Sequence, residues 1–314
     1  MENIAKALPI REIYDVYHGA VLPVLLKDKT TGKNIIWATD EYSTISPTDQ
    51  ILFKEITGGS MMRVRPRIAK SLDAQKDRTR KRAEVFTPSW VCNQMNNAID
   101  DEYLGYAGAF NEEGDRCWTR NLKKVKFGEG KSWQEYVGLT RLEITCGEAP
   151  CVTSRYNPTD GTVIAVKDRI GFLDRKLRVV HENADGDEYK AWSMRALESS
   201  YGYEFQGDNL LIARINVFLT WFEHWNLKLG ETPDVKTARS AANVIAWNFW
   251  QMDGLKGVPP QVKKTESGQM TLPGFEQASN SSDTCEEAKE CLIYDWRSHC
   301  SRTYNSLKSR ENGR

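Results

Sequence analysis

The stretch YGYEFQGDNLLIARINVFLTWFEHW, residues 201–225, decides the fold class. It opens with a short run typical of a strand, and a long apolar helical pattern follows it directly. Another strand candidate, RLEIT (141–145), lies upstream, and a third, AWNFW (246–250), lies downstream. Helical patterns separate the three runs. Strands that alternate with helices predict an α/β protein with a mostly parallel sheet.

The N-terminal part of the chain is expected to add a hairpin and two helices. Within residues 20–45, the turn signal TTGKN lies between two apolar runs, which predicts a β-hairpin. Residues 62–82 hold nine basic side chains against two aspartates, and Pro66 suits the start of a helix. A second helix is expected from Pro88, whereas the Gly- and Lys-rich residues 105–131 indicate a loop.

The C-terminal part changes in composition. Residues 261–290 are rich in Ser, Glu, Lys and Gln, which predicts a flexible linker. The apolar run CLIYDW (291–296) after it is the last strand candidate. The expected segments are 1–82 with the hairpin and the basic helix, 83–260 with the α/β domain, 261–290 as the linker, and 291–314 as a strand and basic tail.

Composition excludes several classes of protein. The 314 residues carry 43 Lys+Arg and 43 Asp+Glu, so a globally basic nucleic-acid-binding protein is excluded and any such contact must use a local patch. Mean hydropathy is −0.58 and no run of 18 apolar residues occurs, so no membrane partner is expected. The first residues lack an apolar signal segment, and the seven cysteines include no CxxC pair. We therefore expect a cytoplasmic protein with reduced thiols.

Polar groups follow each of the three strand candidates. Gly147 lies in the CGEAP segment after the first run, Glu204 ends the second, and Asp253 follows the third. Because the carboxyl ends of parallel strands meet at one edge of a sheet, a glycine and two acids there are suited to bind a nucleotide-like ligand. The alternatives are an ordinary βα turn at Gly147, a solvated acid beside a helix cap at Asp208, and an Asp-Gly turn at Asp253.

Together with FTP at 86–88, these segments resemble adenine-N6 DNA methyltransferases of the γ arrangement, the M subunits of restriction-modification systems. The resemblance implies a Rossmann-like sheet that binds S-adenosylmethionine, and double-stranded DNA as the substrate. It also implies that the FTP segment closes over the cofactor, that one acid holds the ribose and that another holds the adenine amine. The matching residues are Phe86, Thr87, Pro88, Glu143, Gly147, Glu204 and Asp253.

The chain departs from that family at the catalytic segment. The Asn/Asp-Pro-Pro-Tyr/Phe motif, which accepts from the target amine and stacks on the flipped base, is absent. The nearest substitute is Asp295 with Trp296, an acceptor beside an aromatic ring; the alternative is a final core strand with a salt-bridged Asp295. Two functions follow: a DNA methyltransferase that needs a second subunit, or a catalytically inactive relative that acts as a DNA-binding or partner subunit.

The basic run is the candidate surface for nucleic acid. An excess of one sign of charge favours phosphate contacts, although a solvated helix is the usual meaning of a charge run. The residues expected to contact phosphates are Arg63, Arg65, Arg67, Arg78, Arg80, Lys81 and Arg82. No metal site is expected, because the spacing of Cys285, Cys291, His299 and Cys300 matches no usual zinc pattern.

Overall fold

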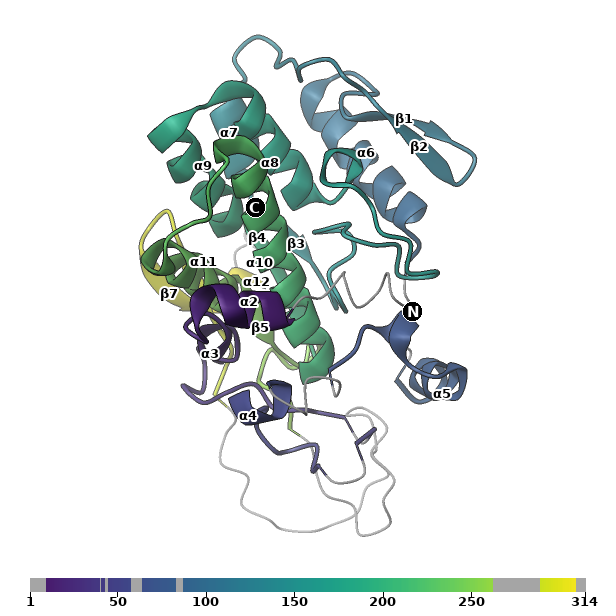
Figure 1. The fold of residues 1–314 in the computed structure, drawn as a ribbon, viewed down its shortest axis with the longest axis vertical. Helices are drawn as coiled ribbons and strands as arrows, with labels where there is room; N and C mark the ends of the chain where they lie inside the picture. The colour runs from purple at the N-terminus through teal and green to yellow at the C-terminus, as the bar shows by residue number, and fades with distance from the viewer. Residues whose placement is uncertain are drawn as a thin grey trace.

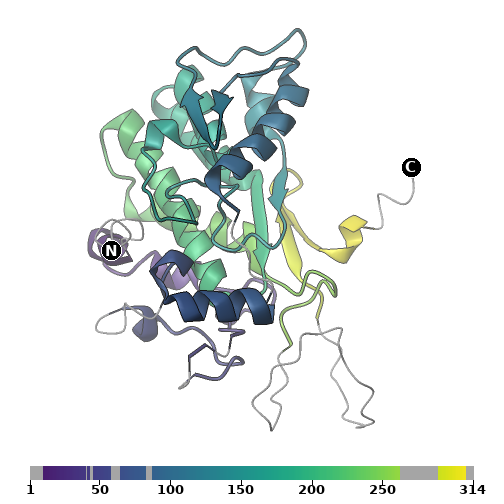
Figure 2. The same cartoon turned by 90° about the vertical axis from the view of Figure 1, so that its right-hand side faces the viewer.

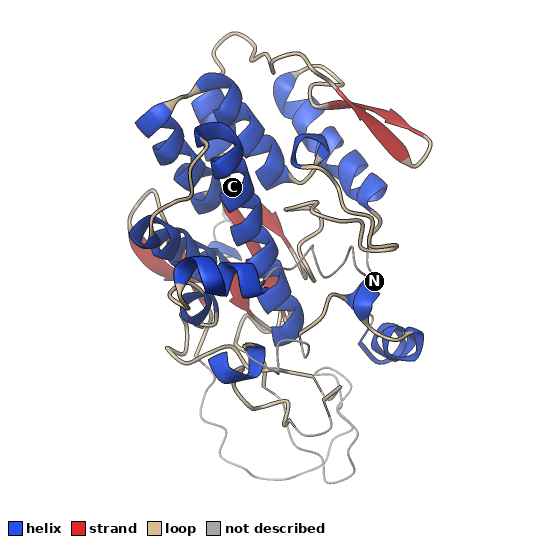
Figure 3. Ribbon diagram, in the orientation of Figure 1, coloured by secondary structure: helices blue, strands red, loops and turns tan. Residues whose placement is uncertain are grey.

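The sheet that organises the molecule has three parallel strands in the order β3–β4–β5 (Figure 1). The computed structural model describes residues 10–39, 41–42, 45–57, 64–82, 87–261 and 289–308. The strands are β3 (Arg141–Glu143), β4 (Ser200–Glu204) and β5 (Phe249–Gln251). Helices make up most of the remaining elements (Figure 3).

Helices connect the three strands, as the sequence predicted. Between β3 and β4 lie α8 (Phe172–Asn183) and α9 (Gly186–Glu198), and between β4 and β5 lie α10 (Gly207–Leu229) and α11 (Val235–Asn248). The three parallel strands therefore alternate with pairs of helices. The last helix runs further than expected, since α11 extends to Asn248 and β5 begins only at Phe249.

The two faces of the sheet are covered differently. Helices α10 and α11 pack on one face. A hairpin of β6 (Leu292–Asp295) and β7 (Cys300–Thr303), followed by α12 (Asn305–Lys308), lies on the other. Between this hairpin and the sheet is a small second core whose buried members are Tyr203, Trp250, Met252, Cys291 and Ile293.

The remaining elements surround the sheet and its helices. The main core extends from Ile10 to Phe249, so the N-terminal residues pack into it rather than form a core of their own. These elements are α2 (Ile10–Tyr17), α3 (Leu22–Leu25), α4 (Phe53–Ile56), η2 (Arg67–Ala69), α5 (Leu72–Arg82), α6 (Ser89–Leu104), β1 (Asn111–Gly114), β2 (Cys117–Arg120), α7 (Trp133–Gly138) and η3 (Val166–Asp168).

The hairpin predicted within residues 20–45 was wrong. The turn forms, because the Asp28 carboxylate accepts from the backbone N–H groups of Thr30 and Thr31. Among the described residues of this segment, one bridge, Lys27 with Asn34, joins the two sides. Pro23 favours a helix start, and the first apolar run becomes α3.

The predicted loop at 105–131 was also wrong in part. It contains the β1–β2 hairpin, whose turn places Arg116 at a φ of 53°. Its strands are mostly exposed and lack the apolar alternation from which a strand is recognised. The basic helix starts later than Pro66 suggested, because α5 begins at Leu72 after the short turn η2.

The described residues contain a narrower sheet than a Rossmann-like fold requires. The last strand candidate, CLIYDW, does not extend the parallel sheet. Instead, β6 pairs with β7 antiparallel through the four residues 296–299, a connection too short for parallel strands. The predicted linker 261–290 lies outside the described residues except for 261, 289 and 290.

Candidate functional site

The loop after β3 has an unusual backbone. Thr145, Gly147 and Ala149 have φ angles of 46°, 54° and 63°. Residues other than glycine rarely adopt this left-handed conformation, and such strain tends to occur at functional sites. Positive φ at alternate residues is also typical of backbone concavities that bind anions. The loop is held against the sheet by a 2.8 Å hydrogen bond from the Cys146 N–H to the Tyr203 carbonyl.

Glu204 joins this loop to the end of β4. Its Oε2 accepts from the Gly147 N–H at 2.8 Å, and its Oε1 accepts from the Gln206 N–H at 3.1 Å. The side chain is buried, with 7% exposed. The structure therefore brings the predicted Gly147 and Glu204 together at the carboxyl edge of the sheet. A carboxylate oxygen can accept more than one hydrogen bond, so a ligand's hydroxyl groups would share the Glu204 oxygens with these backbone N–H groups.

Two other acids support the loop. The Glu143 carboxylate accepts from the N–H groups of Cys151 and Val152 at 3.4 and 3.2 Å, and removal from water raises the pKa of Glu143 well above its usual range. Glu148 is buried and accepts from the Tyr156 hydroxyl and from the Arg67 N–H. Glu143 thus holds the turn after the loop, and Glu148 fastens the basic segment to it. The sequence reasoning did not single out Glu148, although it follows Gly147 directly.

Asp253 lies just beyond the carboxyl end of β5. Its Oδ1 accepts from the N–H groups of Leu255 and Lys256 at 3.0 and 3.2 Å, and its backbone bridges to Val258. This arrangement matches the Asp-Gly turn that the sequence left open. One carboxylate oxygen therefore holds a turn, and a ligand would be bound through the other oxygen.

Thr87 and Pro88 precede α6. Cys92, in the first turn of α6, lies 3.0 Å from Cys151 between their sulfur atoms, so the start of α6 approaches the turn that follows the loop. Phe86 lies outside the described residues.

The structure does not bring Asp295 and Trp296 to this edge. The Trp296 Nε1 donates to Asn248 Oδ1 at 2.7 Å, and Asn248 precedes β5. The Asp295 carboxylate accepts from the turn after β6 and lies 3.6 Å from Arg302. Both residues are therefore at the amino end of the parallel strands. This geometry agrees with the alternative in which Asp295 is a salt-bridged residue of a final strand.

Arg78 of the basic run lies inside the protein. Its guanidinium binds both carboxylate oxygens of Asp208, at 2.9 and 3.1 Å, and Lys70 Nζ lies 3.0 Å from the same group. Burial opposes ionisation of Asp208, but Lys70 and Arg78 outweigh it and lower the pKa of Asp208 to about 2. Asp208 lies in the first turn of α10, four residues after Glu204, so this cluster holds α5 close to the candidate site (Figure 2).

The outer side of α5 carries the exposed charges. A surface groove of about 300 Å³ is lined by Arg67, Leu72, Gln75, Lys76, Thr79 and Arg80. Arg65 is exposed nearby in sequence. Lys76 was not singled out from the sequence, although it lies in the same run. Arg63 lies outside the described residues, and Lys81 and Arg82 are described only as the last two backbone positions of α5.

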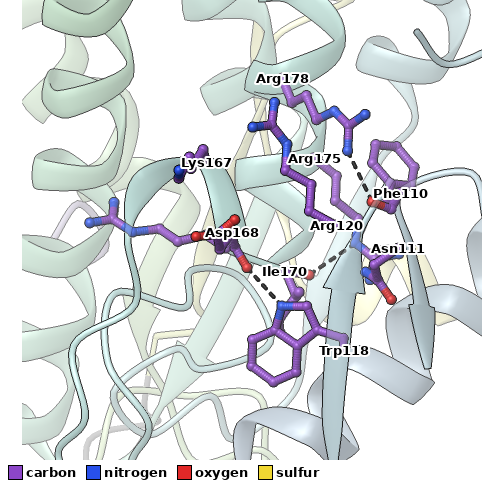
Figure 4. Close-up of a pocket in the computed structure, with 10 residues that line it drawn as sticks. Phe110, Asn111, Trp118, Arg120, Lys167, Asp168, Ile170, Arg175 and Arg178 are labelled. Atoms are coloured by element: carbon purple, nitrogen blue, oxygen red, sulfur yellow. Dashed lines mark hydrogen bonds between the residues drawn. The ribbon is translucent and has the colours of Figure 1, made fainter. Parts of the chain in front are cut away.

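A second basic cluster lies between the β1–β2 hairpin and α8 (Figure 4). Three of its cations donate to protein partners: Arg178 to the Phe110 carbonyl, Arg175 to the Ile170 carbonyl, and Arg169 to Glu223. The Trp118 Nε1 donates to the Asp168 carbonyl. Because these donors hold the protein's own chain together, the cluster is a weaker candidate than the Gly147–Glu204 edge.

Other kinds of site find less support. Within the described ranges no three His, Cys, Asp or Glu side chains gather in a way that could hold a metal ion; Cys285 lies outside those ranges. Among the described helices, none combines the length and apolar character that a membrane crossing requires. Comparison with protein-family models, curated proteins and solved structures finds no match for this chain.

Proposed function

We propose that this chain binds S-adenosylmethionine at the carboxyl edge of β3–β4–β5 and double-stranded DNA along α5. It serves in an adenine-N6 DNA methyltransferase of a restriction-modification or phage-defence type system, in the cytoplasm. The bond between the Gly147 N–H and the Glu204 carboxylate, inside a strained loop at the ends of two parallel strands, carries this proposal.

The residues at this edge fit such a cofactor. Glu204 accepts hydrogen bonds from hydroxyl groups, which suits the ribose. Three N–H groups of the loop 145–149 already donate within the protein, so the loop shapes the site beside Glu204. The second oxygen of Asp253 can accept from an amine. The bound cofactor supplies the methyl group. The chain's own residues bind and orient it.

The basic segment supports the choice of DNA. Arg67 is tied to Glu148 through its backbone, and Arg78 anchors α5 to Asp208, so the cations on the outer side of α5 are fixed close to the loop. Phosphate contacts from Arg67, Lys76 and Arg80 would position a duplex without reading its sequence. A base extruded from that duplex would have a short path to the carboxyl edge.

The position of Asp295 and Trp296 favours an enzyme of two subunits, in which the catalytic residues lie on the other subunit. Both lie at the amino end of the sheet, so this chain supplies neither the acceptor for the target amine nor the stacking ring through them. A second subunit therefore provides these groups. If no such subunit exists, the chain acts as a catalytically inactive DNA-binding relative, and cofactor binding would remain.

Calorimetric titration of the full chain with S-adenosylmethionine tests the proposal. Wild type should bind, and Glu204→Ala should bind at least tenfold more weakly, because hydrogen bonds to a charged group contribute about 1.5–3 kcal/mol. Glu198→Gln, an acid that ends α9 before the amino end of β4, is the control and should keep wild-type affinity. No heat at millimolar cofactor, or equal affinity in the folded Glu204→Ala variant, would contradict the proposal.

A further inference from the structure

Two thiols at the base of the loop are not used by the proposed function. Cys92 is fully buried in the first turn of α6, and Cys151 is half-buried in the turn after Ala149. Their sulfur atoms are 3.0 Å apart, and both cysteines are free. A disulfide has a sulfur–sulfur bond of about 2 Å, so closing this pair requires a movement of about 1 Å.

We propose that Cys92 and Cys151 form an oxidation site for peroxides that closes to an intrachain disulfide. The site is distinct from the cofactor site and does not depend on the proposed function. Among the six described cysteines, this pair is the one whose two sulfur atoms lie within hydrogen-bonding distance of each other.

The order of events follows from exposure. Cys151 reaches solvent, so its thiolate attacks a peroxide oxygen, the O–O bond breaks, and a sulfenic acid and one water form. The buried Cys92 sulfur then attacks the Cys151 sulfur, the S–O bond breaks, and a second water leaves. Two thiols and one hydrogen peroxide thus give one disulfide and two waters, and the two electrons pass from sulfur to peroxide.

The surroundings make this reaction slow at neutral pH. The hydrogen bond to Cys92, together with burial, raises the pKa of Cys151 well above its usual range. Because the thiolate is the nucleophile, the rate should increase with pH. The product would join α6 to the turn whose N–H groups bind Glu143, and so would fix the end of the loop.

Mass spectrometry of the reduced full chain after hydrogen peroxide treatment tests this inference. The expected product has lost two hydrogen masses, forms faster at higher pH, and is restored by a thiol reductant. Trypsin releases Cys146 and Cys151 in one peptide, so variants must identify the partner of Cys92. Cys92→Ala and Cys151→Ala should abolish the cross-link, whereas the controls Cys146→Ala and Cys300→Ala should retain it.

Three results would overturn the inference: no cross-link, a cross-link that survives in Cys151→Ala, or addition of oxygen to Cys151 without loss of hydrogen. Circular dichroism of each variant establishes that the chain is folded before treatment. The readout is a peptide mass and needs no cofactor. A negative result for the disulfide would therefore not affect the cofactor proposal. A negative result for cofactor binding would likewise not affect the disulfide.

Discussion

At the scale of single residues, the site depends on backbone conformations that its side chains disfavour. Left-handed φ angles at Thr145 and Ala149 cost about 1–2 kcal/mol each relative to glycine. Hydrogen bonds from the Cys146 and Gly147 N–H groups to Tyr203 and Glu204 of β4 hold the loop in this form. The loop is thus stabilised by the sheet rather than by its own sequence.

Thr145→Gly should leave the stability unchanged or raise it by up to about 1 kcal/mol. Glycine adopts a φ of 46° without strain, and this gain offsets the greater freedom of the unfolded chain. Thr140→Gly, an exposed threonine on the other side of β3 without a positive φ, is the matched control and should lose about 0.5–1 kcal/mol. Urea unfolding of both variants measures the difference. Equal losses would show that Thr145 is not strained.

Asp208→Asn should destabilise the fold near neutral pH and much less in acid. The folded pKa of Asp208 is about 2, below its ordinary value of 3.8, so the ionised form contributes roughly 2–3 kcal/mol above pH 4. That contribution falls as the pH drops from about 4 to 2. Denaturant unfolding of wild type and variant at pH 6 and pH 3 measures it. Asp187→Asn, a fully exposed acid, should change stability little at either pH, and a pH-independent loss in Asp208→Asn would contradict the assignment.

At the scale of elements, α5 has an inner side and an outer side. The inner Arg78 is bound to Asp208, and the outer Lys76 and Arg80 face solvent. One basic segment therefore contains both a buried ion pair and solvent-facing charges. Its composition alone did not show which residues belong to each group. The pairing of Arg78 with Asp208 spans 130 residues, so no local pattern could have indicated it.

Reversing charges on the outer side of α5 should weaken DNA binding. Lys76→Glu with Arg80→Glu should lower duplex affinity and reduce the slope of log affinity against log salt by about 1 for each lost phosphate contact. Lys236→Glu, an exposed residue of α11, is the control and should behave as wild type. Fluorescence anisotropy at several salt concentrations measures both quantities. An unchanged slope in the double variant would show that α5 is a solvated helix that does not contact phosphates.

The sequence predicted the helical elements better than the strands. The 3.6-residue spacing of apolar residues was sufficient to predict α8 to α11, because the apolar faces of these helices pack in the main core. Strand prediction failed where Pro23 turned an apolar run into a helix and where the β1–β2 hairpin had no apolar face. The contact of Gly147 with Glu204 followed from the rule for parallel strands, whereas the position of Asp295 depended on an antiparallel turn that the sequence did not reveal.

At the scale of the whole molecule, the described parallel sheet extends from β3 to one side only. The chain proceeds from β3 to β4 to β5 in one direction, and in the described part of the chain no strand pairs with the other edge of β3. Leu142 and Ile144 on that strand and just after it are 42% and 63% exposed. Ligands of open α/β sheets bind where strands run outward in both directions, so our proposal of a second subunit places it at the unpaired edge of β3.

The purified chain alone should therefore transfer methyl groups to DNA weakly or not at all. Transfer of labelled methyl from S-adenosylmethionine to mixed-sequence duplex is the assay, with a known DNA methyltransferase as the positive control. Robust turnover by this chain would contradict the need for a second subunit. Turnover that is lost in Asp295→Ala and Trp296→Ala would restore those residues to the catalytic role that the sequence suggested.

The most direct test of the cofactor site is hydrogen–deuterium exchange of the full chain with and without S-adenosylmethionine. Amide exchange should slow in peptides that cover 144–152 and 203–207, where we propose that the loop and Glu204 hold the cofactor. No change is expected in the turn at 296–299, which lies at the opposite end of the sheet. Protection confined to the β6–β7 hairpin, or no protection at saturating cofactor, would contradict this proposal.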